Sequence, residues 1–189
     1  MKKIIITGGL GYIGSELCKI YSGYSWNDKI IVIDNRFISE RVNQLRNWNI
    51  EFIHGDILDK DLIYKHCSNA DIVHHLAGIT DVPRVKSEAN AEHEKKIEEV
   101  AIKGTQNIID SIKDDCKIIF PSTHVVYEGI DKVKTNIQEN EATKPVLSYS
   151  SSKAVNEDQL KKSGKNYVIL RLGSVYGYST DSMRIDIMP

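Results

Sequence analysis

The sequence has little cysteine and no excess of charge of either sign. Its three cysteines, Cys18, Cys67 and Cys116, are odd in number and far apart, which suits neither a disulfide framework nor a zinc site. Buried, reduced thiols in a cytoplasmic protein are the simpler interpretation. Because the net charge is only −1 over 189 residues, we expect no nucleic-acid or anionic-membrane partner, since both favour a basic excess.

Long apolar runs and metal-ligand clusters are also missing. No stretch approaches the roughly 18 apolar residues of a membrane span, and a glycine turn follows the first isoleucines too soon for a signal peptide. The six histidines lack ligand spacing, and the adjacent His74 and His75 would point to opposite faces of a strand. We therefore expect a soluble domain with no metal site.

Against this plain background, the first fourteen residues stand out. Ile4, Ile5 and Ile6 form the β-branched run of a buried parallel strand, and Gly8, Gly11 and Gly14 follow at the spacing of a dinucleotide-binding turn. The first glycine would permit the tight turn, the second the approach of a pyrophosphate, and the third close packing of helix on strand. A helix starting near Gly11 would direct its N-terminal N–H groups at the phosphates.

The choice of nucleotide depends on Asp34, which ends the apolar run 29–34 twenty residues after Gly14. A carboxylate there accepts hydrogen bonds from the ribose hydroxyls of NAD and would repel the 2′-phosphate of NADP. Arg36, two residues later, leaves NADP open. A strand that simply ends in Asp is the alternative.

Strands alternate with helices along the rest of the chain, which predicts a doubly wound parallel α/β sheet of the Rossmann type in three αβα layers. Ile13, Leu17 and Ile20 recur at helical spacing after the glycines, and Asp59 has the position of a helix N-cap. We place further strands at 50–54, 71–76, 117–120 and 167–171, and helices at 88–112 and from 148 or 149 onward.

The second half carries a candidate for catalysis. Tyr149 and Lys153 are four residues apart, so on a helix the phenol and the ammonium lie one turn apart on one face. A tyrosine with a pKa near 10 is a poor base at neutral pH, and a neighbouring cation lowers that pKa. Thr123, after the strand 117–120, could hydrogen-bond the same substrate oxygen. Such Tyr–Lys pairs also occur by chance on exposed helices.

The chain resembles the extended short-chain dehydrogenase/reductase family, in its branch of NAD-dependent nucleotide-sugar epimerases and dehydratases. The resemblance covers essentially the whole chain, in the family's order and spacing. The matching segments are residues 7–14, 32–35, 55–59, 75–78, 104–105, 122–127, 149–153 and 170–177.

The resemblance implies specific roles. Tyr149 would be the catalytic acid/base, Lys153 would lower its pKa and hold the nicotinamide ribose, and Thr123 would be the catalytic hydroxyl. Asp56 and Ile57 would contact adenine. The resemblance and the motifs together imply NAD-binding positions at Gly8, Gly11, Tyr12, Ile13, Gly14, Asp34, Asn35, Asp56, Ile57, Leu76, Ala77, Gly78, Tyr149 and Lys153. The implied partners are a nucleotide-sugar substrate and a second copy in a homodimer.

Departures from the family pattern shape the functional prediction. His124 and Val125 replace the Asp-Glu pair of the dehydratases, which favours an epimerase; Ala101 and Ser174 each replace a family asparagine. The resemblance also implies a longer chain. We therefore expect residues 1–189 to be an NAD-binding domain lacking most of its C-terminal substrate domain, which would begin at 172–189. An NAD(P)-dependent reductase or dehydrogenase of another alcohol or ketone, or a non-catalytic NAD-binding protein, remains the alternative.

Overall fold

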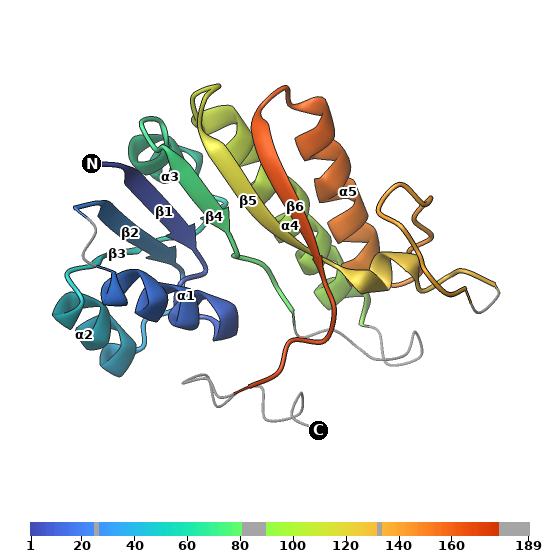
Figure 1. The fold of residues 1–189 in the computed structure, drawn as a ribbon, viewed down its shortest axis with the longest axis horizontal. Coiled ribbons are helices and arrows are strands. Elements are labelled where there is room, and N and C mark those ends of the chain that lie inside the picture. Colours follow the sequence, from blue (N-terminus) through green and yellow to red (C-terminus); the bar gives the residue numbers. More distant parts are fainter. Residues whose placement is uncertain (25–26, 81–89, 132–133, 178–189) are drawn as a thin grey trace.

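A six-stranded parallel sheet organises the computed structural model, which describes residues 1–24, 27–80, 90–131 and 134–177 (Figure 1). Its strands stand in the order β3-β2-β1-β4-β5-β6, so the chain winds outward in both directions from β1. This confirms the predicted doubly wound sheet. The strands are β1 (Lys3–Thr7), β2 (Lys29–Asp34), β3 (Glu51–His54), β4 (Ile72–His75), β5 (Lys117–Thr123) and β6 (Asn166–Leu172).

Helices lie on both faces of the sheet and make the predicted three layers (Figure 1). Helices α1 and α2 cover the face formed by Ile4 and Ile6, whereas α3, α4 and α5 cover the face formed by Ile5. Because side chains alternate along a strand, the uninterrupted isoleucine run supplies both cores at once. The helices are α1 (Tyr12–Gly23), α2 (Ser39–Asn47), α3 (Lys60–Cys67), α4 (Ala91–Ser111) and α5 (Ser148–Lys162), and a 3₁₀ turn, η2, spans His124–Tyr127.

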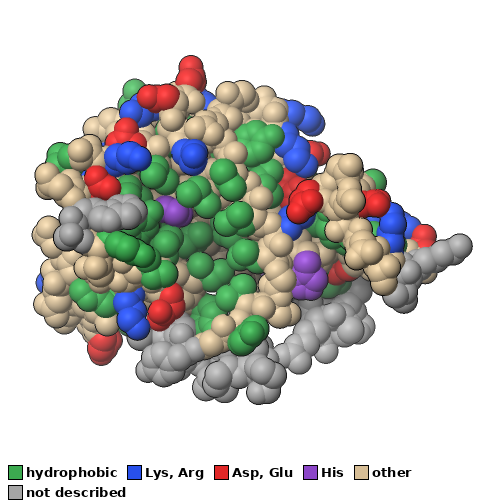
Figure 2. Space-filling model, in the orientation of Figure 1, with side chains coloured by type: hydrophobic (Ala, Val, Ile, Leu, Met, Phe, Trp, Pro, Cys, Tyr) green, Lys and Arg blue, Asp and Glu red, His purple; other side chains and the backbone are tan. Residues whose placement is uncertain are grey.

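The face that carries α1 and α2 is covered over only part of its width. Val168 and Leu170 of β6 are 38% and 44% exposed there, and their β5 partners are Ile119 and Pro121. Figure 2 shows apolar side chains gathered near the centre of this face. No helix among the described residues packs on it beside β6.

Three details were not predicted from the sequence: two concern the helices α1 and α2, and the third concerns β5. Ile13 and Ile20 are exposed, because α1 packs through Gly14, Ser15 and Cys18. The short helix α2 was not predicted, since its only buried residues are Val42 and Leu45 in a polar segment.

The strand β5 is also longer than predicted and continues through Pro121 to Thr123. Proline lacks the N–H that a central strand donates. The ladder between β4 and β5 ends at Ile119, so no bond to β4 is lost at Pro121, whereas β6 stays paired as far as Thr123.

Several expectations about composition are borne out in the described part of the chain. Cys18, Cys67 and Cys116 are buried and unpaired. Burial raises the pKa of the Cys18 and Cys67 thiols to about 12. His74 and His75 face opposite sides of the sheet, toward Tyr21 of α1 and Thr105 of α4 respectively. No helix within the described ranges combines the length and apolarity needed to cross a bilayer.

Candidate active site

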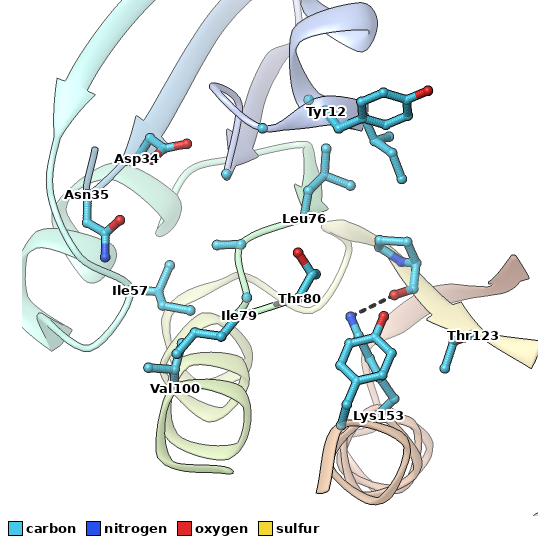
Figure 3. A pocket seen from close by; sticks show the side chains of 18 of the residues that line it. Tyr12, Asp34, Asn35, Ile57, Leu76, Ile79, Thr80, Val100, Thr123 and Lys153 are labelled. Carbon is cyan, nitrogen blue, oxygen red and sulfur yellow. Dashed lines mark hydrogen bonds between the residues drawn. The ribbon is translucent and has the colours of Figure 1, made fainter. Parts of the chain in front are cut away.

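A cavity of about 790 Å³ runs along the carboxyl ends of the strands and brings the predicted site residues together (Figure 3). Asp34 and Asn35 lie at one end, and Thr123 and Lys153 at the other. Chain segments far apart in sequence therefore share one wall. All the predicted positions line it: Gly8, Gly11, Tyr12, Ile13, Gly14, Asp34, Asn35, Asp56, Ile57, Leu76, Ala77, Gly78, Thr123, Tyr149 and Lys153.

The glycine loop between β1 and α1 is built for close contact. Gly8 has φ +70°, and a Cβ there would lie 2.7 Å from the backbone nitrogen of Ala77. A Cβ on Gly14 would lie 2.4 Å from the Gly8 carbonyl oxygen. These two positions therefore admit only glycine, and the loop can press against both the helix and the end of β4.

Gly11 has a different part in the same loop. It is the N-cap of α1 and supplies no side-chain cap, so the first-turn N–H groups of the helix lack the usual side-chain acceptor. Gly11, Tyr12 and Ile13 all line the cavity. The geometry fits a phosphate at the positive end of the helix.

Asp34 ends β2 with its carboxylate buried and only 5% of the residue exposed. One oxygen accepts a hydrogen bond from the Leu10 backbone N–H at 3.0 Å, and the other accepts from the Arg36 backbone N–H at 3.0 Å. The Arg36 Nε lies 3.4 Å from the same carboxylate. Arg36 thus partly neutralises Asp34, and the remaining lone pairs can accept from ribose hydroxyls. The residues fit the adenosine half of NAD.

A buried histidine ties the glycine loop to β4 and α4. The two ring nitrogens of His75 lie 2.9 Å from Thr7 Oγ1 and 3.0 Å from Thr105 Oγ1. Thr7 Oγ1 also accepts from the Ala77 backbone N–H at 3.2 Å. Burial, with a smaller effect of the Lys153 charge, lowers the pKa of His75 to about 3. The imidazole is therefore neutral, and its two hydrogen bonds connect the end of β1, through Thr7, to α4, through Thr105.

At the other end of the cavity, Lys153 is fixed against β5. Its ammonium donates a 2.9 Å hydrogen bond to the Pro121 carbonyl and lies 4.5 Å from the centroid of the Phe120 ring. The same nitrogen lies 5.9 Å from the centroid of the Tyr149 ring, as one turn of helix requires. Burial lowers the pKa of Lys153 to about 8. Below that pH the side chain is mostly protonated and places a positive charge close to Tyr149.

Thr123 closes this end of the site. It is buried, and its Oγ1 accepts a 3.3 Å hydrogen bond from the Val125 N–H at the start of η2. The hydroxyl proton can still be donated to a substrate oxygen. The structure thus brings Thr123, Tyr149 and Lys153 to one end of one cavity, and their catalytic roles remain predictions.

A buried ion pair behind this end was not predicted. Glu157, only 1% exposed, accepts from Ser122 Oγ at 2.6 Å and from Arg171 Nε and Nη2 at 2.9 and 2.6 Å. Burial opposes the charge of Glu157, but the bonds from Arg171 and Ser122 hold the pKa of its carboxyl below the ordinary value. The recurrence of Tyr149, Lys153 and Glu157 every four residues was the available sequence signal.

Further residues line the cavity that were not among the predicted site residues. Leu172 is the last residue of β6 and residues 173–175 follow it, and Val100, Lys96 and Glu99 come from α4. Ala101, which replaces a family asparagine, is not among the lining residues, and its backbone carbonyl accepts a 3.1 Å hydrogen bond from Asn156 Nδ2 of α5. Most of the predicted substrate region lies outside the described residues, since the description ends at 177.

Comparison with known proteins agrees with this geometry. Residues 5–184 match the 3-beta hydroxysteroid dehydrogenase/isomerase family. Among curated proteins, a dTDP-D-glucose 4,6-dehydratase of Dictyostelium discoideum is 31% identical over 94% of this chain and 44% of its own length. A putative UDP-glucose 4-epimerase of Methanocaldococcus jannaschii is 31% identical over 94% of this chain and 57% of its own length.

The solved structure of a Bacillus cereus UDP-glucuronic acid 4-epimerase in complex with NAD matches 94% of this chain and 58% of its own chain. The TM-score is 0.76 and the identity 27%. The predicted resemblance is confirmed, and NAD, the predicted cofactor, is bound in this solved relative. The chain spans about half the length of the curated relatives that it matches.

Proposed function

Because the chain belongs to the 3-beta hydroxysteroid dehydrogenase/isomerase family, we propose that it is the NAD-binding part of a nucleotide-sugar epimerase. One observation carries the proposal: the glycine loop with Asp34 and the Tyr149–Lys153 pair line opposite ends of the same cavity. An extended dinucleotide fits that arrangement, with its adenosine at Asp34 and its nicotinamide near Tyr149. Relatives named as epimerases support this assignment.

The chemistry follows from the side chains at the Lys153 end. Tyr149, as phenolate, removes the proton of a sugar hydroxyl, and NAD supplies the hydride acceptor when it is bound. The Lys153 ammonium, 5.9 Å from the ring centroid, favours the phenolate. Thr123 donates a hydrogen bond to the reacting oxygen and orients it.

Two side chains favour epimerisation over loss of water. The residues after Thr123 are His124 and Val125, and a 4,6-dehydration needs an acid and a base there. His124 is exposed, and its Nδ1 lies 3.2 Å from the Leu172 carbonyl oxygen. Val125 has no proton to exchange. A second candidate, NAD-dependent oxidation of another secondary alcohol with the same Tyr149 as the base, is supported by the steroid-dehydrogenase family match.

The remaining parts of the proposal concern organisation. We treat residues 1–189 as the cofactor-binding domain and 172–189 as the beginning of a substrate-binding region. The three buried thiols suit a reducing compartment such as the cytoplasm. Homodimerisation through the outer faces of α4 and α5 would give twice the monomer mass by light scattering, and a monomer at all concentrations would contradict it.

NAD binding is the first test. The 189-residue protein should bind NAD in calorimetry, or release NAD(H) on denaturation if it retains the cofactor. NADP should bind more weakly, because its 2′-phosphate meets the buried Asp34. A preparation that neither releases nor binds NAD would contradict the proposal.

Substrate class needs a separate assay. UDP-, dTDP- and GDP-sugars, with a sterol and a simple secondary alcohol beside them, should be offered to the protein with NAD. Interconversion of sugar epimers without net NADH supports the epimerase. Stoichiometric NADH from an alcohol supports the second candidate, and NAD binding without turnover would show that residues 1–189 alone bind the cofactor without catalysing the reaction.

A further inference from the structure

The helix that carries Tyr149 lacks a side-chain acceptor at its N-cap. Helix α5 begins at Ser148, and its N-cap residue is Leu147, whose side chain cannot accept a hydrogen bond from the first N–H groups. Within the helix, Ser150 Oγ accepts a 3.2 Å hydrogen bond from the Leu147 N–H, and Ser148 Oγ donates to Glu94 of α4 at 2.9 Å. Tyr149 lies in this first turn. A first turn without an N-cap acceptor frays more readily than the rest of a helix, so contacts from outside the helix help to fix the phenol.

Glu128, which follows η2, adds an acceptor for the N–H groups at and just before the N-cap. Its Oε1 accepts hydrogen bonds from the Val146 and Leu147 backbone N–H groups at 2.7 and 2.8 Å, and from the Ser150 hydroxyl. Partial burial opposes the charge, but the bonds from Ser150, Leu147 and Val146 lower the pKa of the Glu128 carboxyl. A carboxylate at this end also suits the helix dipole.

The position of Glu128 links this cap to the predicted catalytic threonine. Thr123 is the N-cap of η2, and Glu128 is the residue that follows its last turn. The segment Thr123–Glu128 therefore connects the Thr123 hydroxyl at one end to the first turn of α5 at the other. The Lys153 and Glu157 contacts to β5 hold later turns of α5, whereas Glu128 and the Ser148–Glu94 contact hold its start.

We propose that Glu128 is a positioning residue, which caps α5 from outside the helix and sets the orientation of Tyr149 relative to Thr123 and Lys153. This inference rests on the proposed function, because it assigns to Tyr149 the role of base. Glu128 does not line the NAD cavity, so its effect on the reaction is indirect. A misplaced base slows proton transfer while leaving the NAD site intact.

Three variants test the cap. Glu128→Ala removes the acceptor, whereas Glu128→Gln keeps an oxygen that can accept the same bonds. The matched control is Glu141→Ala, which removes a glutamate of the same loop that pairs with Lys134. We expect Glu128→Ala to lower kcat roughly ten- to hundredfold with little change in KM or NAD affinity. Glu128→Gln should recover most of the loss, and Glu141→Ala should match the wild type.

A second measurement does not need turnover. With ¹³C-labelled tyrosine, the Tyr149 Cζ resonance, assigned by its loss in Tyr149→Phe, should move in NAD-saturated Glu128→Ala and stay near its wild-type position in Glu128→Gln and Glu141→Ala. If wild type binds NAD but turns over no substrate, residues 1–189 alone are not an active epimerase, and this resonance still tests the cap. If Glu128→Ala leaves both kcat and the resonance unchanged, or if Glu128→Gln is as impaired as Glu128→Ala, the positioning role is overturned.

Discussion

The part of the sheet formed by β1, β2 and β3 is covered by helices on both faces, whereas β6 and its β5 partner leave apolar side chains exposed on one face. The covered part holds the predicted adenosine site. The sparsely covered part holds Thr123 and faces the helix that carries Tyr149 and Lys153. The Asp34 end of the cavity is therefore built on strands that helices cover on both faces, whereas the Thr123 end is built on strands that helices cover fully on one face only.

This difference follows from how each part is built. The glycine loop and Asp34 are placed by short-range turns and by β1 and β2, which are neighbours in the sheet. The predicted catalytic end depends on contacts between residues far apart in sequence, such as Ser122 with Glu157 and Pro121 with Lys153. The matching relatives are much longer than this chain, and we propose that their additional residues support the second part.

Replacing Tyr149 should separate the two parts most sharply. Tyr149→Phe removes the acid/base and keeps the ring, so turnover should fall by roughly 10²- to 10⁴-fold, while NAD affinity stays close to the wild-type value. Steady-state kinetics and calorimetry measure the two effects. Unchanged turnover would remove Tyr149 from the mechanism.

Removing Glu157 should destabilise the catalytic part. Glu157→Ala leaves Arg171 without its main partner in a site where the two side chains are 1% and 13% exposed, and we expect a loss of about 3–5 kcal/mol in the free energy of unfolding. In the control Glu51→Ala, the lost partner is Lys29 and both side chains are largely exposed, so the change should stay below about 1 kcal/mol. Urea unfolding measures the free energy of unfolding of both variants. Equal losses in Glu157→Ala and Glu51→Ala would contradict the prediction that the buried pair contributes more stability than the exposed one.

Acid should destabilise the covered part through His74, which packs against Tyr21 of α1. Burial lowers the pKa of His74 to about 4, so the folded protein keeps it neutral while the unfolded chain takes up a proton below about pH 6.5. The free energy of unfolding should therefore fall by about 3 kcal/mol from pH 6.5 to pH 4 on account of this residue. His74→Gln should show a shallower decline in urea unfolding at several pH values, and an unchanged slope would contradict this.

A pair of glycines tests the cofactor end more finely. Gly8→Ala forces a side chain into φ +70° against the Ala77 backbone, and we expect a loss of about 1–3 kcal/mol in stability together with weaker NAD binding. A Cβ on Gly78 would meet nothing within 4 Å. Gly78→Ala should therefore change stability by less than about 0.5 kcal/mol. Similar changes in the thermal stability of Gly8→Ala and Gly78→Ala would contradict the close packing of Gly8 against the Ala77 backbone.

The smallest effect is expected on the exposed face of β6. Leu170 is 44% exposed, so Leu170→Thr should change the free energy of unfolding by less than about 0.5 kcal/mol. Binding of a hydrophobic dye such as ANS should nevertheless decrease, since the exposed apolar area shrinks. A large loss of stability would mean that this face is covered.

Local patterns predicted more of the molecule than long-range contacts did. The isoleucine run, the three glycines and Asp34 predicted β1, the loop and the end of β2, because each needs only a few neighbouring residues. The spacing of Ile13, Leu17 and Ile20 predicted α1, but of the three only Leu17 packs against the core, since Gly14 brings the helix close to the sheet through small residues. Helix α2 was missed because just two of its residues are buried.

The sequence by itself determined the parallel sheet and the glycine loop, because spacing and residue type are sufficient for those features; the other residues along the cavity came mostly from the family resemblance. The tertiary structure decided what holds them. Only the folded chain brings Glu157 to Ser122 and Arg171, and Glu128 to the start of α5. Polar contacts of this kind depend on distances between separate elements, and no local pattern of residues encodes those distances.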